Sequence, residues 1–311
     1  MEDGSNDIRV IEGKLGEVIS EATEVFISLI SDSVGKAVEQ EGVMQKVMMA
    51  VGGKKAEEAV APYIGAVSLL AFSGKYVNRE SVESIISSIG INPDTGIMNF
   101  VSLINLRNDA VFVPALFFMK ALGKEPDADS MGKIVEAMGI EADKDGAGRV
   151  LGLYGEMQKE DYSTKKRLLD DKLAKPITDS AKLMAKIMIM ELRRTFENRG
   201  IGQQMQKGLL PYVVGAGVMA YSGKGKEVNG ESISTLIKVI GIEPDQSMLG
   251  YFSSLNYGTV DLAYVPIIFF LREAGRVVNI QNIRNVMRAM GAQIDEAFAE
   301  YILTIYFTNE R

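Results

Sequence analysis

Apolar residues recur three and four positions apart in four short stretches, and each stretch follows a residue that favours the start of a helix. In the first stretch, Val82, Ile85, Ile86 and Ile89 come after Asn78. This spacing places the apolar side chains on one face of a helix of about three turns. The same spacing recurs in Met131, Ile134, Val135 and Met138 after Asp127; in Ile233, Leu236, Ile237 and Ile240 after Asn229; and in Ile283, Val286, Met287 and Met290 after Asn279. Since Asn and Asp are favoured N-caps, the sequence predicts four amphipathic helices.

Glycine and aspartate stand at fixed distances around these helices. Each N-cap lies four positions after a first glycine, at Gly74, Gly123, Gly225 and Gly275. A second glycine follows sixteen positions after the first, at Gly90, Gly139, Gly241 and Gly291. An aspartate follows four positions later, at Asp94, Asp143, Asp245 and Asp295. We expect the second glycine to end the helix in a left-handed cap, and the aspartate to begin the next helix.

An apolar helix of about a dozen residues is predicted before each first glycine. It begins with an aromatic residue in every case, at Tyr63, Phe112, Tyr212 and Tyr264. Each module is thus predicted to contain a first apolar helix, a short loop, the amphipathic helix, a turn and a third helix. A unit of this size buries too little apolar surface alone, so the modules are expected to pack in pairs.

The four modules belong to a longer repeat. The stretch from Tyr63 to Asp94 matches the one from Tyr212 to Asp245, and each module pair follows a long amphipathic segment. The sequence therefore predicts an all-α, internally duplicated protein with two halves, residues 1–157 and 158–311. The long helical segments are placed at residues 1–60 and 158–208, and the module pairs at 61–157 and 209–311. The two modules of one half are expected to pair with each other.

Two stretches of the repeat, GKYVNRESVESIISSIGINPD and GKGKEVNGESISTLIKVIGIEPD, carry a resemblance to a known family. The order of features is an aromatic–apolar helix, a GK turn, valine, Asn with an acid, an apolar stripe and a Gly-Ile turn ending in aspartate. This order resembles the N-terminal dimerisation domain of the acidic stalk P-proteins of archaeal and eukaryotic ribosomes. The resemblance covers Ala61–Tyr154 and Leu210–Tyr306 in four copies.

In that family, a small helical dimer holds helices of a larger stalk-base protein through hydrophobic surface. The resemblance implies a non-enzymatic, cytoplasmic scaffold of archaeal origin that is a candidate for association with the ribosome. Such a scaffold holds a partner helix, such as one of a stalk component, in an apolar groove. The residues expected to line the groove are Tyr63, Leu69, Phe112, Phe118, Tyr212, Met219, Tyr264 and Phe269. Ordinary core packing is the competing interpretation of these eight residues. Recruitment of translation factors is not carried over, because the sequence has no acidic, hinged tail.

The composition narrows the possible chemistry. The 311-residue chain has no Cys, His or Trp, so it lacks thiol nucleophiles, imidazole acid–base groups and Cys/His zinc ligands. A net charge of −7 does not favour general binding to nucleic-acid phosphate. The apolar runs are shorter than the roughly 18–20 residues of a membrane span, and the polar N-terminus does not resemble a secretory signal. No catalytic, cofactor-binding or metal-binding residue is predicted.

Three alternatives remain open. The protein attaches to a membrane surface if Phe117, Phe118, Phe269 and Phe270 are exposed. It is an enzyme if Asp, Glu and Lys side chains converge in a cleft between modules; the four repeated aspartates, however, fit helix capping better. It contacts RNA locally if the basic residues Lys165, Lys166, Arg167, Arg193 and Arg194 form a patch, although acidic residues interleave with them and favour a solvated helix face.

Overall fold

The computed structural model describes residues 5–39, 55–73, 75–104, 108–141, 143, 145–159, 170–199, 208–221, 228–252 and 264–309. Over these ranges the chain forms fourteen α-helices, a short 3₁₀-helix η1 (Asn108–Val111) and no strand, which confirms the predicted all-α class. Two helices are long, α1 (Ser5–Glu39) and α9 (Asp170–Arg199). The first helices of the modules are α3 (Lys55–Phe72), α6 (Phe112–Ala121), α11 (Leu210–Tyr221) and α14 (Tyr264–Glu273).

The four predicted amphipathic helices are present with the predicted N-caps. They are α4 (Arg79–Ser88), α7 (Ala128–Ala137), α12 (Gly230–Val239) and α15 (Ile280–Ala289). At the start of α4, the Asn78 side chain accepts a hydrogen bond from the backbone N–H of Ser81 at 2.9 Å, which satisfies a donor that the helix leaves unpaired. Asp127, Asn229 and Asn279 accept the equivalent bond from the third residue after them.

Each amphipathic helix ends at the predicted glycine in the left-handed region, with φ between 69° and 76° at Gly90, Gly139, Gly241 and Gly291. At the end of α4, the N–H of Gly90 donates to Ser87 at 3.0 Å and the N–H of Ile91 donates to Ile86 at 3.2 Å. These two bonds form a Schellman motif, which only a residue tolerant of positive φ completes without strain. The prediction of left-handed caps is confirmed at all four positions.

The third helices are α5 (Thr95–Val101), α8 (Gly146–Met157), α13 (Gln246–Phe252) and α16 (Glu296–Asn309). Asp94, Asp245 and Asp295 begin three of them as predicted, because each carboxylate accepts a backbone N–H of the first turn. The prediction is wrong for Asp143. Helix α8 begins three residues later, at Gly146, and Asp143 forms an ion pair with Arg149 at 2.7 Å.

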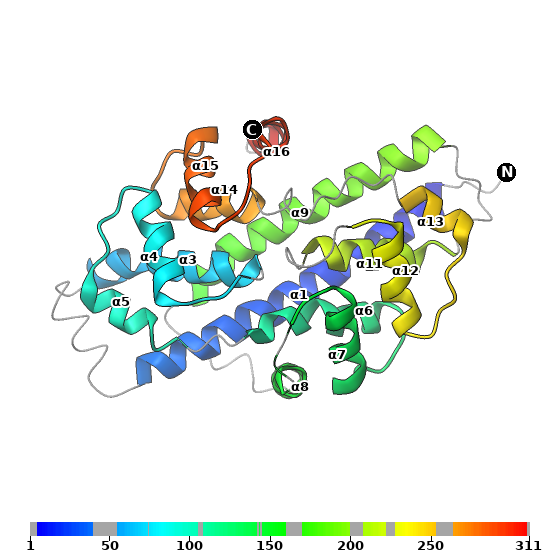
Figure 1. Ribbon diagram of the computed structural model, residues 1–311, viewed down its shortest axis with the longest axis horizontal. Coiled ribbons are helices and arrows are strands. Elements are labelled where there is room, and N and C mark those ends of the chain that lie inside the picture. The colour runs from blue at the N-terminus through cyan, green and yellow to red at the C-terminus, as the bar shows by residue number, and fades with distance from the viewer. Residues whose placement is uncertain are drawn as a thin grey trace.

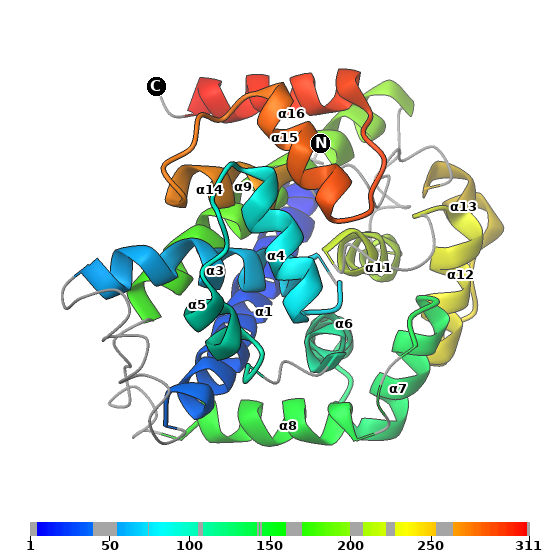
Figure 2. The ribbon, with the colours of Figure 1, turned by 60° about the vertical axis from the view of Figure 1, so that its left-hand side comes forward.

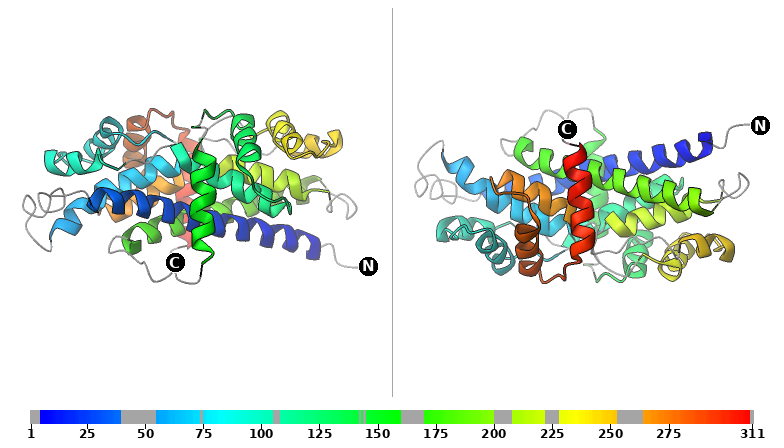
Figure 3. Two further views of the ribbon diagram at one scale, coloured as in Figure 1. Left: turned by 90° about the horizontal axis from the view of Figure 1, so that it is seen from below. Right: turned by 90° about the horizontal axis from the view of Figure 1, so that it is seen from above.

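The two long helices α1 and α9 run across the molecule (Figure 1), and the helices lie in three layers (Figure 3). Side views place α1 and α9 along one face of the molecule, and α4, α7, α12 and α15 along the opposite face (Figure 3). The first helices α3, α6, α11 and α14 form the layer between them, while α8 and α16 cross the edges. Buried apolar side chains of all three layers and both halves form one continuous core. The core therefore includes residues from both halves of the sequence.

Modules pair across the two halves, so the expectation of pairing within one half is wrong. Helix α3 packs against α14 and α4 against α15, while α6 packs against α11 and α7 against α12 (Figure 2). The hydroxyl of Ser84 on α4, for example, donates to the carbonyl of Ala289 on α15 at 3.4 Å. Helix α3 begins at Lys55, six residues before the expected start of the first module pair at residue 61.

Candidate functional site

The eight side chains expected to line a partner groove lie in the core. Their exposed fractions range from 0% for Phe118 and Tyr264 to 6% for Phe269. The other five are Tyr63, Leu69, Phe112, Tyr212 and Met219, each at most 3% exposed. In this arrangement none of the eight is an exposed anchor. Their contact with another protein would require the helices packed over them to separate.

Three of these aromatic residues hold the start of a third helix, a role that the sequence analysis missed. The backbone N–H of Asp94 donates to the Tyr63 hydroxyl at 2.8 Å, and the same bond joins Asp245 to Tyr212 and Asp295 to Tyr264. Burial raises the pKa of Tyr63, although the bond from Asp94 opposes this shift. The signal was present, since tyrosine and aspartate recur at matching positions in these three modules.

The second module has Phe112 in place of this tyrosine, and its third helix begins differently. A Cβ atom at Gly146 would lie 2.5 Å from the Phe112 ring, so the glycine allows α8 to approach the ring closely. In place of a bond to a tyrosine hydroxyl, the turn before α8 contains the ion pair between Asp143 and Arg149 and a hydrogen bond from the N–H of Asp145 to the Asp143 carboxylate at 3.1 Å.

The apolar groove between paired modules exists, but a long helix of the same chain fills it. On the α6–α11 pair, Leu15, Val18 and Ala22 of α1 meet Phe117 of α6 and Val218 of α11. The void between these side chains measures about 10 Å³. A water molecule needs about 10–15 Å³, so the three helices are closely packed.

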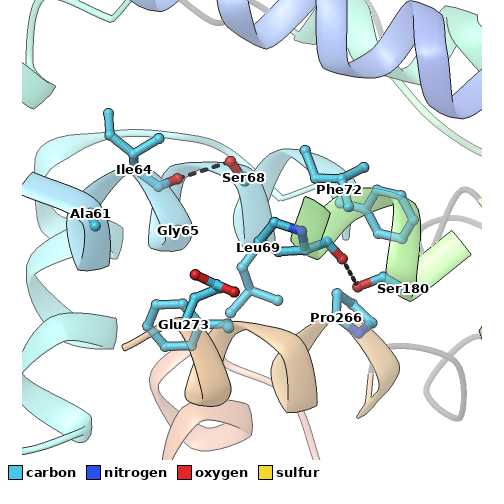
Figure 4. A pocket seen from close by; sticks show the side chains of 12 residues that line it. Ala61, Ile64, Gly65, Ser68, Leu69, Phe72, Ser180, Pro266 and Glu273 are labelled. Carbon is cyan, nitrogen blue, oxygen red and sulfur yellow. Dashed lines mark hydrogen bonds between the residues drawn. The ribbon is translucent and has the colours of Figure 1, made fainter. Parts of the chain in front are cut away.

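Helix α9 fills the corresponding groove on the α3–α14 pair. Ile177 and Ser180 of α9 face Ile64 of α3 and Phe270 of α14 around a void of about 40 Å³. Figure 4 shows side chains of the three helices converging on this void. The Ser180 hydroxyl donates within its own helix to the Pro176 carbonyl at 2.7 Å. This small, mostly apolar void is packing space between helices and is too small for an organic ligand.

A polar clamp fastens each long helix to the second module of its own half. In the first half, Lys120 of α6 donates a hydrogen bond to the Tyr154 hydroxyl of α8 and lies 3.5 Å from Glu21 of α1. The Phe117 and Tyr154 rings meet edge to face, 6.0 Å apart. Burial opposes the charged form of Lys120, but the bond to Tyr154 and the charge of Glu21 outweigh it and raise the pKa of Lys120.

The second half repeats this clamp with a different cation. Arg272 of α14 donates to Asp179 of α9 at 2.8 Å and bonds to the Tyr306 hydroxyl of α16. The Phe269 and Tyr306 rings again meet edge to face, 5.7 Å apart. Burial raises the pKa of Asp179, but hydrogen bonds from Lys175 and Arg272 outweigh it and hold that pKa below its usual value.

A groove that no other described helix fills runs between α1 and α9. These two helices lie along the face opposite α4, α7, α12 and α15 (Figure 3). The volume of the groove is about 540 Å³. Small residues of both helices form its floor, namely Gly16 and Ser20 on α1 and Ala181 and Ala185 on α9. Apolar surface is added by Ile19, Ile189 and Met190, and Met190 is 38% exposed. We call this the α1–α9 groove.

The two walls of the α1–α9 groove differ in charge. On α9, the exposed positions with described side chains are Lys175, Lys182, Lys186 and Met190, and the last three line the groove. On the α1 wall, Glu24 is the one charged lining residue; Glu17, two turns before it, forms an ion pair with Lys14 at 3.0 Å. The groove therefore has lysines on one wall and a single carboxylate on the other, on either side of an apolar floor.

A second cavity, of about 630 Å³, lies between α1, η1 and α8. Its charged lining includes the buried Asp109, which accepts two hydrogen bonds from Arg149 at 2.7 and 2.6 Å. The bond to Asp109 raises the pKa of Arg149. The Ser33 hydroxyl in this cavity donates to the Leu29 carbonyl at 3.0 Å. Tyr301 occupies the position in the second half that matches Arg149, so the ion pair is not repeated there.

The remaining expectations concern membranes, metals and RNA. Phe117, Phe118, Phe269 and Phe270 are buried, so they do not form a membrane-facing surface in this arrangement. Among the described residues, no helix is long and apolar enough to span a membrane, and no three Asp or Glu side chains cluster as metal ligands. Lys165, Lys166 and Arg167, and the side chains of Arg193 and Arg194, lie outside the described residues.

No protein-family model, curated protein or solved structure matches the chain.

Proposed function

We propose that the chain is a non-catalytic protein-binding scaffold whose binding site is the α1–α9 groove. The apolar floor of this groove, with Met190 exposed at its end, carries the proposal. Lining residues from Thr178 to Met190 extend for about 18 Å along α9. An amphipathic helix of that length binds a groove through apolar side chains three and four residues apart.

The same proposal relates the four modules to one another and to the stalk dimerisation domain. Equivalent N-caps, left-handed glycines and tyrosine-to-aspartate bonds in different modules support an origin by duplication. On this interpretation each module pair holds a helix, as in the stalk, but the helix belongs to the same chain. Because α1 and α9 fill those grooves, another protein binds at the α1–α9 groove. A ribosomal stalk component is one candidate partner.

An enzyme that uses carboxylates and lysines is the second candidate, and the cavity beside η1 is the observation that favours it. A volume of about 630 Å³ is typical of small-molecule sites. However, its buried carboxylate, Asp109, is already bound by Arg149. The scaffold proposal is preferred because catalysis at this cavity would require breaking a bidentate ion pair.

The test of the scaffold proposal is to block the groove and measure protein capture. Ala185→Arg places a long charged side chain on the groove floor, and Ala297→Arg adds the same charge at an exposed position of α16. The wild-type chain and Ala297→Arg are expected to capture the same partner from an extract of the source organism, and Ala185→Arg to lose it. Circular dichroism melts check that both variants fold, and Met190→Glu repeats the test at an exposed residue. Equal capture by all variants contradicts the proposal.

A further inference from the structure

The charges of the α1–α9 groove indicate what kind of helix it accepts. Lys182 and Lys186 are one turn apart on the α9 wall, and Glu24 faces the groove from α1. The protein as a whole carries a charge of −7, so this basic wall is a local exception. Opposite charges along an interface guide binding and disfavour partners with the wrong charge.

We infer that the groove binds an amphipathic helix with acidic residues one turn apart along the edge that faces α9. The opposite edge of that helix carries a basic residue toward Glu24, and its apolar face lies on Ala181, Ala185 and Ile189. This inference rests on the proposed function of the groove and adds the chemistry of its partner.

The shape of the groove favours a single helix over a second copy of the chain. Side chains of a helix form a ridge that fits between two other helices. A second copy that docked with the same face would set groove against groove, and each groove has a volume of about 540 Å³. Unfilled apolar space is unfavourable because the side chains around it lose contacts. A single ridge fills the groove without leaving such space.

The probe is a synthetic amphipathic helix of about 18 residues, or five turns. It has leucine and alanine on one face, glutamates along one edge and lysines along the other. A peptide of the same composition in scrambled order controls for the apolar face. A third peptide has lysines on both edges. Binding to the full chain is measured by fluorescence anisotropy at low salt, where surface charges are least screened.

We expect the wild-type chain to bind the probe, and the double variant Lys182→Glu, Lys186→Glu to bind it roughly tenfold more weakly. The same variant is expected to bind the all-lysine peptide more tightly than the wild-type chain does. The control variant Lys124→Glu, Lys238→Glu has the same net charge, with both changes at exposed positions outside the groove, and should bind the probe like the wild type.

The inference is overturned by no binding of the probe to the wild-type chain, by equal binding of the scrambled peptide, or by no effect of the lysine reversals. If Ala185→Arg abolishes binding of the probe and the lysine reversals do not, the groove binds a helix and only the charge inference fails. If Ala185→Arg leaves probe binding intact, the proposed site fails as well. A dimer in sedimentation that Ala185→Arg dissociates would identify a second copy as the occupant and also overturn the inference.

Discussion

Single polar residues determine where the long helices are held. Asp179 of α9 receives hydrogen bonds from Lys175, one turn earlier on the same helix, and from Arg272 of α14. Glu21 of α1 takes the matching position beside Lys120 of α6. Each acidic residue thus adds a polar contact between a long helix and a first helix of its own half, beside the apolar packing of the same helices.

The effect of Asp179→Asn should depend on pH. The pKa of Asp179 is lower in the folded protein than its ordinary value of 3.8. The ionised carboxylate therefore stabilises the fold above pH 3.8, and this stabilisation is lost as the pH falls through the pKa of the folded protein. We expect the substitution to lower the free energy of unfolding by about 0.5–1 kcal/mol at pH 7. The difference should shrink below pH 3.8. Urea unfolding at several pH values measures the difference in unfolding free energy. Glu83→Gln, at an exposed position of α4, is the control. A difference that does not vary with pH would refute this role.

At the scale of helices, one close approach joins α11 to α1. A Cβ atom at Gly217 would lie 2.7 Å from the Leu15 side chain and 3.8 Å from Met188 of α9. The Gly-X-Gly in this helix resembles a nucleotide-binding pattern in sequence, but its second glycine provides space for a neighbouring helix. The side chains of α1 enter the α6–α11 groove only because this position is small.

Gly217→Val is therefore expected to destabilise the protein. Overpacking of a close helix contact costs about 1–3 kcal/mol, which thermal and urea unfolding both detect. Gly13→Ala in α1 is the matched control, since no atom lies within 4 Å of the added Cβ. That substitution should stabilise the protein by about 0.5–1 kcal/mol through helix propensity. Equal effects of the two substitutions would show that α11 and α1 do not approach each other as described.

The helices could be predicted from the sequence because the signals that start and end them are local. Asn78 with Ser81 and the glycine at position 90 each determine a helix end through neighbours in the chain. The choice of module partner was predicted wrongly, because the apolar stripes of the modules are nearly alike and do not encode which stripes meet. The α1–α9 groove was missed for a related reason. Its lining residues are ordinary alanines, serines and lysines, and only the antiparallel packing of two distant helices brings them together.

For the molecule as a whole, pairing across the halves is the claim on which the other conclusions depend. Modules of opposite halves build each groove, and α1 and α9 fill these grooves. Fusion in one chain raises the effective concentration of the modules for each other, so pairing does not depend on protein concentration. Because α1 and α9 fill the module grooves, the proposed binding site is the α1–α9 groove.

Cross-linking tests this claim most directly. The chain has no natural cysteine, so two introduced cysteines are the only thiols that can react. Ser84→Cys with Ala289→Cys places thiols on α4 and α15, where the Ser84 hydroxyl lies 3.4 Å from the Ala289 carbonyl. Ser84→Cys with Ser130→Cys places them on α4 and α7 of the same half. A short bismaleimide should join the first pair within one chain at high dilution, and peptide mass spectrometry should identify the link. Efficient cross-linking of the second pair, without the first, would contradict pairing across the halves.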